Sequence, residues 1–557
     1  MFPFQVLTNF ESCFTNSVRC IIHRIFCNKS LLHRIYLTKE KLTEKEVAFM
    51  EITLEKQSIS LEKTVREEVL EQAIDNEIML PDFCSNMGRI LKCCAKGKII
   101  SKRIVNSVLN IDGNVFLTVF YIDEEGCLKT FEQTLSFYRE LSLEKDREIY
   151  AFVGCKIEHI GCRMLSARKL EMHGSLSLSV KLYEKETAEC IESTPEKDIQ
   201  LCHESKNITL TVGRAEKYTA LTDEIELDSD SDPVTCIVRS GGRVENTECK
   251  TMAGKVIVKG ELCLTVCYMT DRKNFIKEID SVIPFTQIVD ASESNEDCFA
   301  RARSELTALE VRTKTGFDGE VRAFTVSAGI NSEITICKNR EIIFATDAYS
   351  TKNKIDIKCE KICFEKNLSE VRENFSQEYN VDFGTEINGI SDIFGEATVT
   401  DIKTSGGGIA VNGTVQICII ACDGDMSTVY FEKTVDFSHE VCRGEQTAGL
   451  KISPEVFIKS FGYELSGVCA KIKVNMLLCG QIKECFDLKL LSDIAVTEED
   501  AFSKERRPAL TVYYTSEEEK LFEIARKYHT TVDAVKKANG FERDTSEKGM
   551  LILIPGV

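Results

Sequence analysis

The sequence is poor in the residues and motifs on which most enzyme sites depend. It has no tryptophan and only seven histidines among 557 residues. It contains no C-x-x-C pair, no G-x-x-x-x-G-K-[ST] loop and no G-x-G-x-x-G motif after a strand, so the usual zinc, thioredoxin and nucleotide-binding signatures are missing. The histidines lie in different segments without a companion Ser or Cys motif. We therefore expect no catalytic residue, no cofactor and no metal.

Long apolar runs and an excess of basic charge are also absent. No run approaches the roughly 18 apolar residues of a membrane span, and the short stretch CIIHRIF carries Arg and His and lacks a small-residue cleavage site. With 70 basic and 89 acidic residues, the formal net charge is −19. This balance argues against nucleic acid and anionic lipid as partners. We expect a cytoplasmic protein without a transmembrane segment.

Cysteine, in contrast, is abundant. The 25 cysteines cannot all pair within one chain because their number is odd, and without a secretory signal they indicate a reducing compartment. Three C-x-x-x-C pairs recur, at Cys263/Cys267, Cys359/Cys363 and Cys418/Cys422. In a strand, such residues share a face about 13 Å apart, too far to bridge or to share a metal. We interpret them as small apolar core residues, with late oxidative cross-linking as the alternative.

The length predicts three to five domains, and the first segment differs from the rest. Residues 1–49 carry seven basic and four acidic residues, whereas acidic, amphipathic sequence follows from Met50. We interpret residues 1–49 as an unstructured extension or a start assigned too early, with Met50 as the preferred first residue. A basic anchor helix at a membrane surface is the alternative.

An internal repeat organises the middle of the chain. The segments NIDGNVFLTVFY, VIVKGELCLTVCY and AVNGTVQICII align without gaps on Gly113, Gly260 and Gly413, which are 147 and 153 residues apart. Apolar residues stand two, four and six positions after each glycine, as in a strand with one buried face. A helical or extended acidic segment precedes each unit. The pattern predicts three tandem antiparallel β-sandwich domains at residues 50–199, 200–350 and 351–490.

The end of the chain has a different pattern. Residues 491–508 are polar and charged and indicate a linker. Residues 509–557 predict a strand, two helices and a second strand. Ser516 and Glu519 form an S-x-x-E capping box for the first helix. The second helix starts after Thr530 or Thr531 and stops at Asn539-Gly540.

Two resemblances follow from these patterns. The triplicated, glycine-anchored strands resemble the SPOCS repeats of clostridial spore coat morphogenesis proteins, and residues 509–557 resemble a LysM module. The implied fold is mainly β: three tandem antiparallel β-sandwich-like repeats plus a small α+β (βααβ) LysM module. Glu518, Glu519 and Lys520 depart from the Gly-Asp-Ser/Thr that this family usually has. The LysM resemblance rests on Tyr514, Leu521, Ile524-Ala525, Tyr528, Thr531-Val532, Ala538-Asn539, Gly549 and Ile554-Pro555.

The resemblance to SipL/SpoVID-like proteins implies a non-enzymatic scaffold for spore coat assembly and encasement. Such a protein works in the mother-cell cytoplasm and is recruited to the forespore surface. Its LysM module would dock onto a SpoIVA-like coat-basal ATPase, while the β repeats contact other coat proteins. We expect Lys520, Leu521 and Phe522 to contact the partner, with Tyr514 and Asn539 shaping the groove.

Two other functions compete with this interpretation. A peptidoglycan-binding LysM protein could be anchored to the cortex or the cell wall. The absent secretory signal and the Glu518-Glu519 pair argue against it, because a sugar groove needs small residues for close backbone approach. A wall hydrolase targeted by its LysM module would need a catalytic domain, and no constellation of nucleophile or acid and base residues stands before residue 490.

Overall fold

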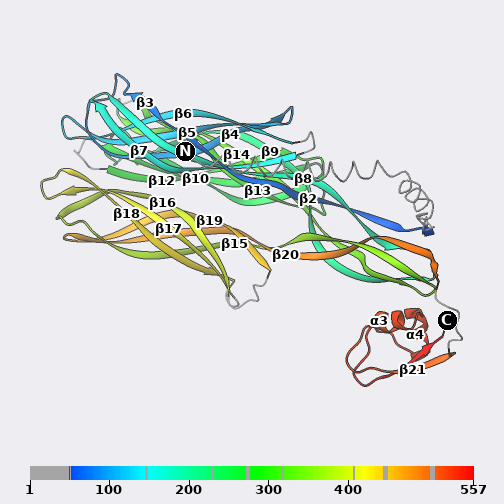
Figure 1. Cartoon of the computed structure of the whole chain (residues 1–557). Helices are drawn as coiled ribbons and strands as arrows, with labels where there is room; N and C mark the ends of the chain where they lie inside the picture. Colours follow the sequence, from blue (N-terminus) through cyan, green and yellow to red (C-terminus); the bar gives the residue numbers. More distant parts are fainter. Residues whose placement is uncertain are drawn as a thin grey trace, which may run out of the picture.

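The computed structural model describes residues 49–50, 52–144, 149–228, 230–270, 276–316, 319–405, 408–442, 449–501 and 508–556. Strands make up most of this part of the chain, and they pair in antiparallel sheets (Figure 1). The prediction of a mainly β protein with antiparallel sheets is confirmed. No helix in the described part is long and apolar enough to cross a membrane. Residues 1–48, which make up nearly all of the predicted extension, lie outside it.

The first repeat unit consists of two sheets that share one apolar core. One sheet has the order β4-β5-β6, and in the other β8 pairs with β2, β3 and β7. Val115, Leu117 and Val119, which follow Gly113 at every second position, are at most 1% exposed and share the core with residues of β8. The strands are β2 (Glu55–Ala73), β3 (Asn76–Met79), β4 (Met87–Val105), β5 (Val108–Asp123), β6 (Leu128–Ser142), β7 (Ile149–Ser166) and β8 (Lys169–Ser193).

The next two units repeat this order of strands, without a counterpart of β3. In the second unit one sheet is β10-β11-β12 and the other β13-β14-β9, and in the third they are β16-β17-β18 and β15-β20-β19. The second unit contains β9 (Ile199–Glu226), β10 (Val234–Met252), β11 (Lys255–Thr270), β12 (Ile276–Asp290), β13 (Phe299–Thr315) and β14 (Val321–Ser350). The third contains β15 (Asn353–Asp382), β16 (Ile387–Ser405), β17 (Gly408–Asp423), β18 (Thr428–Val441), β19 (Leu450–Ser466) and β20 (Cys469–Ala501).

A glycine and a phenylalanine face each other at the same place in all three units. The register pairs Gly113 with Phe137, Gly260 with Phe285 and Gly413 with Phe437. In each case the phenyl ring lies over the glycine, where a Cβ atom would collide with it and with a carbonyl of the neighbouring strand. The three phenylalanines are at most 7% exposed. The glycines that align the repeats are therefore required by close packing, not by a turn.

The three units meet at a common apolar cluster, which we call the junction. It contains Phe120 of the first unit, Cys267 of the second and Ile420 of the third, each at most 1% exposed. Polar contacts also join each pair of units. Thr130 donates to the Ile237 carbonyl at 3.4 Å, Lys92 bonds Glu432 at 2.6 Å, and Arg239 bonds Asp392 at 3.0 Å.

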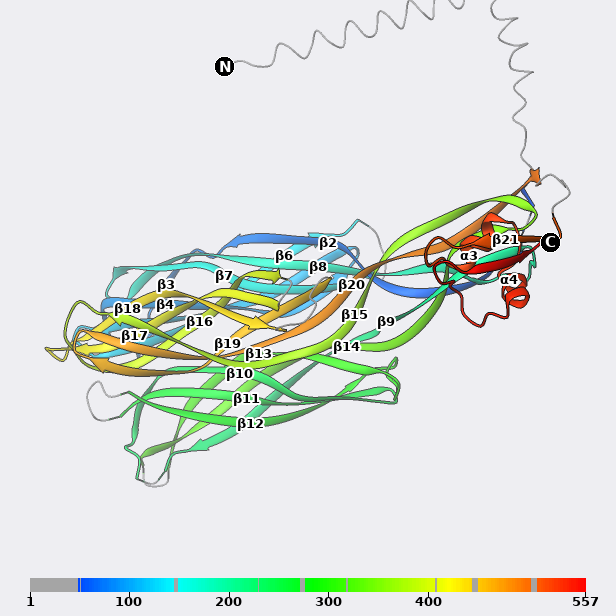
Figure 2. The same cartoon turned by 90° about the horizontal axis from the view of Figure 1, so that it is seen from below.

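The longest strands continue beyond the sandwiches as three paired ribbons, which we call the stalk (Figures 1 and 2). The ribbons are the start of β2 with the end of β8, the start of β9 with the end of β14, and the start of β15 with the end of β20. Their inner residues form a second shared core, in which Ile59, Ile342 and Leu490 are fully buried. Thus the three units contact one another at two places along the molecule.

The stalk explains where the sequence-based boundaries differ from the structure. The acidic segment before each unit, expected to be helical or extended, is extended and lies mainly in β2, β9 or β15 of that unit's own sheet. Residues 491–501, assigned to the linker, continue β20 and pair with β15 and with the short strand β1 (Phe49–Met50). Leu491, Ile494 and Val496 are buried there, Asp493 is exposed, and the buried Ser492 hydroxyl donates to the Lys358 carbonyl at 3.1 Å. These three apolar side chains are enough to bury this part of β20, although the segment as a whole is polar.

The C-terminal module contains β21 (Leu510–Tyr514), α3 (Leu521–Lys527), α4 (Val532–Asn539) and β22 (Leu551–Pro555). The cap of the second helix is as predicted: the Thr531 side chain accepts from the Ala534 N–H, and Gly540 takes a left-handed conformation at the end. The prediction of a capping box for the first helix is wrong. Helix α3 starts after Lys520 without a side-chain cap, and the Glu519 carboxylate instead accepts the Tyr513 hydroxyl at 2.9 Å.

Candidate interaction surfaces

The five residues predicted as partner contacts on the module differ in their surroundings: two support the module from within, two are exposed, and one packs against the stalk. Leu521 is fully buried in the module core. The Asn539 amide donates to the carbonyls of Val535 and Leu553 and accepts from the Leu553 N–H, so it holds α4 on β22. Tyr514 is 65% exposed, and Lys520 is exposed too.

Phe522, the fifth residue, is 7% exposed because it packs against the stalk. Its ring meets the Tyr349 ring edge to face with centroids 5.0 Å apart. The Tyr349 hydroxyl donates to the Thr530 carbonyl at 2.7 Å, and Arg526 pairs with Asp347 at 2.8 Å. Burial raises the pKa of Tyr349, so the hydroxyl stays protonated. The sequence offered no signal that a β14 residue completes the module core.

The loop before α3 is held by its own hydrogen bonds. The Ser546 hydroxyl donates to the Glu519 carbonyl and accepts from the Glu519 N–H. The hydrogen bond with the Glu519 carboxylate raises the pKa of Tyr513. Glu518 next to it is exposed. This loop therefore presents the Glu518 carboxylate to solvent, next to a Glu519 carboxylate that is bonded to Tyr513.

A groove of about 370 Å³ lies beside the contact between the module and the stalk. Lys520 and Glu523 line it from the module, and Glu204, Asp347, Asp487 and Lys489 line it from the stalk. The side chains around the groove are mostly charged. The module thus touches the stalk through a small patch around Tyr349, with an open polar space next to it.

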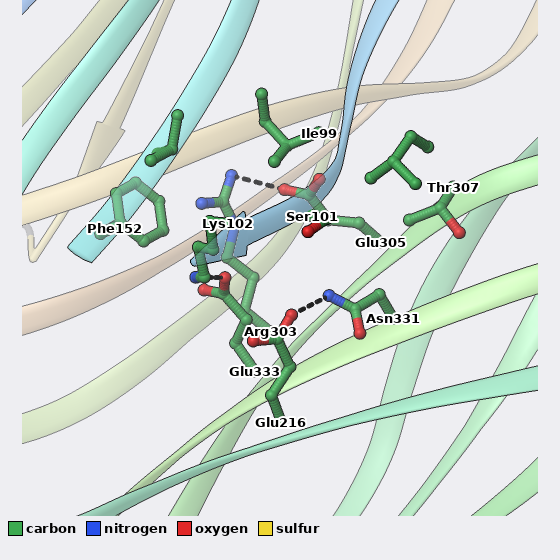
Figure 3. Close-up of a pocket in the computed structure, with 12 residues that line it drawn as sticks. Ile99, Ser101, Lys102, Phe152, Glu216, Arg303, Glu305, Thr307, Asn331 and Glu333 are labelled. Carbon is green, nitrogen blue, oxygen red and sulfur yellow. Dashed lines mark hydrogen bonds and ion pairs between the residues drawn. The ribbon is translucent and has the colours of Figure 1, made fainter. Parts of the chain in front are cut away.

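A second, smaller cavity of about 30 Å³ lies between the first and second units (Figure 3). Lys102 pairs there with Glu333, Asn331 donates to Glu216 at 2.6 Å, and Arg303 pairs with Glu305. Burial opposes the charge of Lys102, but Tyr150 and Glu333 outweigh it and leave its pKa raised. This volume suits one or two waters. The Lys102–Glu333 pair crosses from the first unit to the second, so the cavity is part of the contact between them.

One cluster of the described residues combines ligand types that metals use. The ligand atoms of Cys267, Glu278 and Asp392 lie within 4.8 Å of one another. The Arg239 guanidinium, however, bonds Asp392 at 3.0 and 3.1 Å and the Cys267 sulfur at 3.1 Å. Burial raises the pKa of Cys267, which keeps it a neutral thiol. The guanidinium already supplies the positive charge that balances this cluster, which ties the second unit to the third.

The described cysteines are mostly free thiols. Cys93 and Cys162 form a disulfide between β4 and β7, with Cα atoms 6.2 Å apart. The three C-x-x-x-C pairs are free, as predicted, but only Cys267, Cys418 and Cys422 are buried. The prediction of core residues is wrong for Cys363, which is exposed. Burial raises the pKa of Cys94 to about 12 and that of Cys249 to about 11. Such thiols are poor nucleophiles at neutral pH.

A comparison with known protein families found one match, in two places. The family described as "SipL, SPOCS domain" matches residues 86–165 and 233–314. The first range covers β4 to β7 and the second covers β10 to β13; the equivalent strands of the third unit, β16 to β19, lie outside both. No curated protein and no solved structure matches the chain. The two matched ranges support a SipL-like family and a protein connected with sporulation and the spore coat.

Proposed function

We propose that this protein is a non-enzymatic scaffold for spore coat assembly, built from three SPOCS units and a LysM module. The observation that carries the proposal is the SPOCS match in the first two units together with the third unit's identical strand order and glycine–phenylalanine pair. These features support a triplicated SPOCS protein. A scaffold needs several binding surfaces on one chain, and three units joined to a separate module provide them.

The side-chain chemistry supports a role without catalysis. The cysteines with shifted pKa values are shifted upward by burial, as at Cys94 and Cys249. The carboxylate Asp392 is bonded to an arginine between units. In these environments the groups stabilise the contact between units and do not act as nucleophiles.

The module is the proposed docking element for a SpoIVA-like coat-basal ATPase at the forespore surface. The order β21-α3-α4-β22 and the cap at Thr531 support a LysM assignment. Its sheet has an unusually apolar outer face, on which Leu510, Val512, Tyr514 and Leu551 are 44–65% exposed. An apolar face with an aromatic residue favours a protein partner. In this proposal Tyr514, Lys520 and Phe522 contact the partner, while Leu521 and Asn539 support them from within the module.

The protein would act from the mother-cell cytoplasm. The module binds the basal layer, and the SPOCS units then hold other coat proteins at high local concentration next to it. Binding of the module to the basal layer thereby recruits the coat proteins that the SPOCS units hold.

The test compares binding of the full chain to the SpoIVA-like ATPase of the same organism and to purified peptidoglycan. We expect the ATPase to bind and peptidoglycan not to bind. The double variant Tyr514→Ala/Lys520→Glu should weaken ATPase binding by about tenfold or more, since loss of a hot spot costs roughly 2 kcal/mol. The matched control is Tyr463→Ala, which removes an exposed tyrosine of the third unit. Binding to peptidoglycan alone would refute the proposal and favour a wall-anchored protein.

A further inference from the structure

The three ribbons of the stalk have equivalent inner residues, and this allows their ends to be compared. Buried residues recur with the same spacing at Ala188, Cys190 and Ile191 of β8, at Ile342, Phe344 and Ala345 of β14, and at Leu488, Leu490 and Leu491 of β20. Four positions after the last of each set stand Pro195, Tyr349 and Ala495. Only the ribbon of β9 and β14 therefore has an aromatic residue at this position.

That residue is the one on which the module rests. Tyr349 is 5% exposed, and it belongs to the apolar cluster of the module rather than to the core of the stalk. Its hydroxyl is satisfied by the Thr530 carbonyl, and the ring covers Phe522. Asp347, two positions earlier on the same strand, pairs with Arg526 of α3. We call Asp347 and Tyr349 the seat.

The contact at the seat is small. It includes one ring pair, one buried hydrogen bond, one ion pair whose arginine side chain is 44% exposed, and the packing of Cys202 of β9 against the module's apolar cluster. The groove beside it leaves the rest of the facing surfaces apart. Contacts of this size between parts of one chain are typically reversible. A module that leaves the seat would expose Phe522 next to Lys520, on the surface assigned above to the partner.

We infer that the seat is a docking surface for α3 of the module and that docking there competes with the external partner for Phe522. This inference rests on the proposed function and adds a regulation to it. In the docked form Tyr514 and Lys520 of the module's partner surface are exposed, whereas Phe522 is covered. Full binding requires the module to leave Tyr349, so the apparent affinity is reduced by the fraction of undocked chains.

The experiment measures docking and partner binding separately in the full chain. Amide hydrogen exchange of residues 521–531 without partner reports docking, and titration with the SpoIVA-like ATPase reports affinity. Tyr349→Ala should increase exchange in this segment and tighten ATPase binding by about three- to tenfold, as for a module docked about 70–90% of the time. The matched control is Ile343→Ala, an exposed residue of the same strand, and it should change neither quantity.

A charge exchange gives a second, independent variant. Asp347→Arg should undock the module, and adding Arg526→Asp should restore both the protection and the weaker affinity of the wild type. If undocking by Tyr349→Ala leaves the ATPase affinity unchanged, the competition is refuted while the proposed function stands. If exchange is the same in wild type and Tyr349→Ala, the seat does not hold the module. If the wild type and both undocked variants all fail to bind the ATPase, the proposed function is refuted and the competition with it.

Discussion

Substitution of Gly260 by alanine tests the packing that all three units share. An alanine in place of glycine in the middle of a strand normally stabilises it by about 0.5–1 kcal/mol, because glycine loses more backbone entropy on folding. At Gly260 a Cβ atom would lie 2.5 and 2.6 Å from two ring atoms of Phe285 and 2.7 Å from the Glu245 carbonyl oxygen. Phe285 is 5% exposed, so its ring has little room to move. Gly260→Ala should therefore destabilise the second unit.

The expected cost follows from these distances. Inserting a methyl group into a well-packed core costs about 1–3 kcal/mol, and here one of the close atoms belongs to the backbone, which moves less easily than a side chain. The matched control is Gly241→Ala in the same sheet, where the nearest atom to a new Cβ is an arginine nitrogen at 3.8 Å. The control should gain the normal stabilisation of about 0.5–1 kcal/mol. The two variants should thus differ by about 1.5–4 kcal/mol.

Thermal unfolding followed by far-UV circular dichroism measures this difference, since the chain has no tryptophan for fluorescence. At about 2–4 °C per kcal/mol for a unit of this size, the two midpoints should lie about 3–16 °C apart. The double variant Gly260→Ala/Phe285→Leu should recover part of the loss, because the two close ring atoms are removed and the carbonyl remains. Equal midpoints for Gly260→Ala and Gly241→Ala would refute the packing argument.

Three further predictions concern other parts of the chain. Thr531→Ala should destabilise the module by about 1 kcal/mol through loss of the α4 cap, and the measurement is faster amide exchange in the module. Ser516→Ala should have no effect, because α3 does not use Ser516 as a cap. Burial disfavours the charged form of Glu432, but hydrogen bonds from its lysine and tyrosine neighbours outweigh this and lower its pKa below 4.5. The contribution of Glu432 to stability is therefore present above pH 4.5 and is lost as the pH falls through the lowered pKa. Glu432→Gln should thus reduce the acid-induced fall in melting temperature. An unchanged fall would contradict this prediction. Exposed Cys363 should be alkylated in the native protein well before Cys94, whose pKa is about 12, as measured by mass spectrometry of modified peptides.

The repeat and its strands could be predicted from the sequence because alternation of apolar residues reports directly on one-sided burial. Gly113, Gly260 and Gly413 marked the unit, yet the reason for them was not predictable. Each glycine is matched to a phenylalanine about 24 residues further on in the next strand, and that pairing depends on a register that periodicity alone does not fix. The nearly equal spacing of glycine and phenylalanine in the three copies is the signal in the sequence that points to this pairing.

For the module, the helices and strands could be predicted from the sequence, whereas the contacts between distant residues could not. Its helices and strands follow from local signals, such as the Thr531 cap and the Gly540 stop. Local signals also misled, because Ser516 and Glu519 fit a capping box and the loop instead bonds across to Tyr513 and Ser546. Nothing in a local window indicates that Phe522 is covered by a residue that is more than 170 positions earlier in the chain, Tyr349.

The junction explains why three similar units form one ordered assembly. Phe120, Cys267 and Ile420 each stand seven positions after the glycine that aligns their unit, and all three are buried in the same cluster. Interiors are close-packed, so three equivalent positions that meet at one place share a fixed volume; a large, a small and an intermediate side chain fill it together. Since each unit supplies a different size, replacing one unit by a second copy of another would leave a void or an overlap. The three units are therefore not interchangeable copies at the junction.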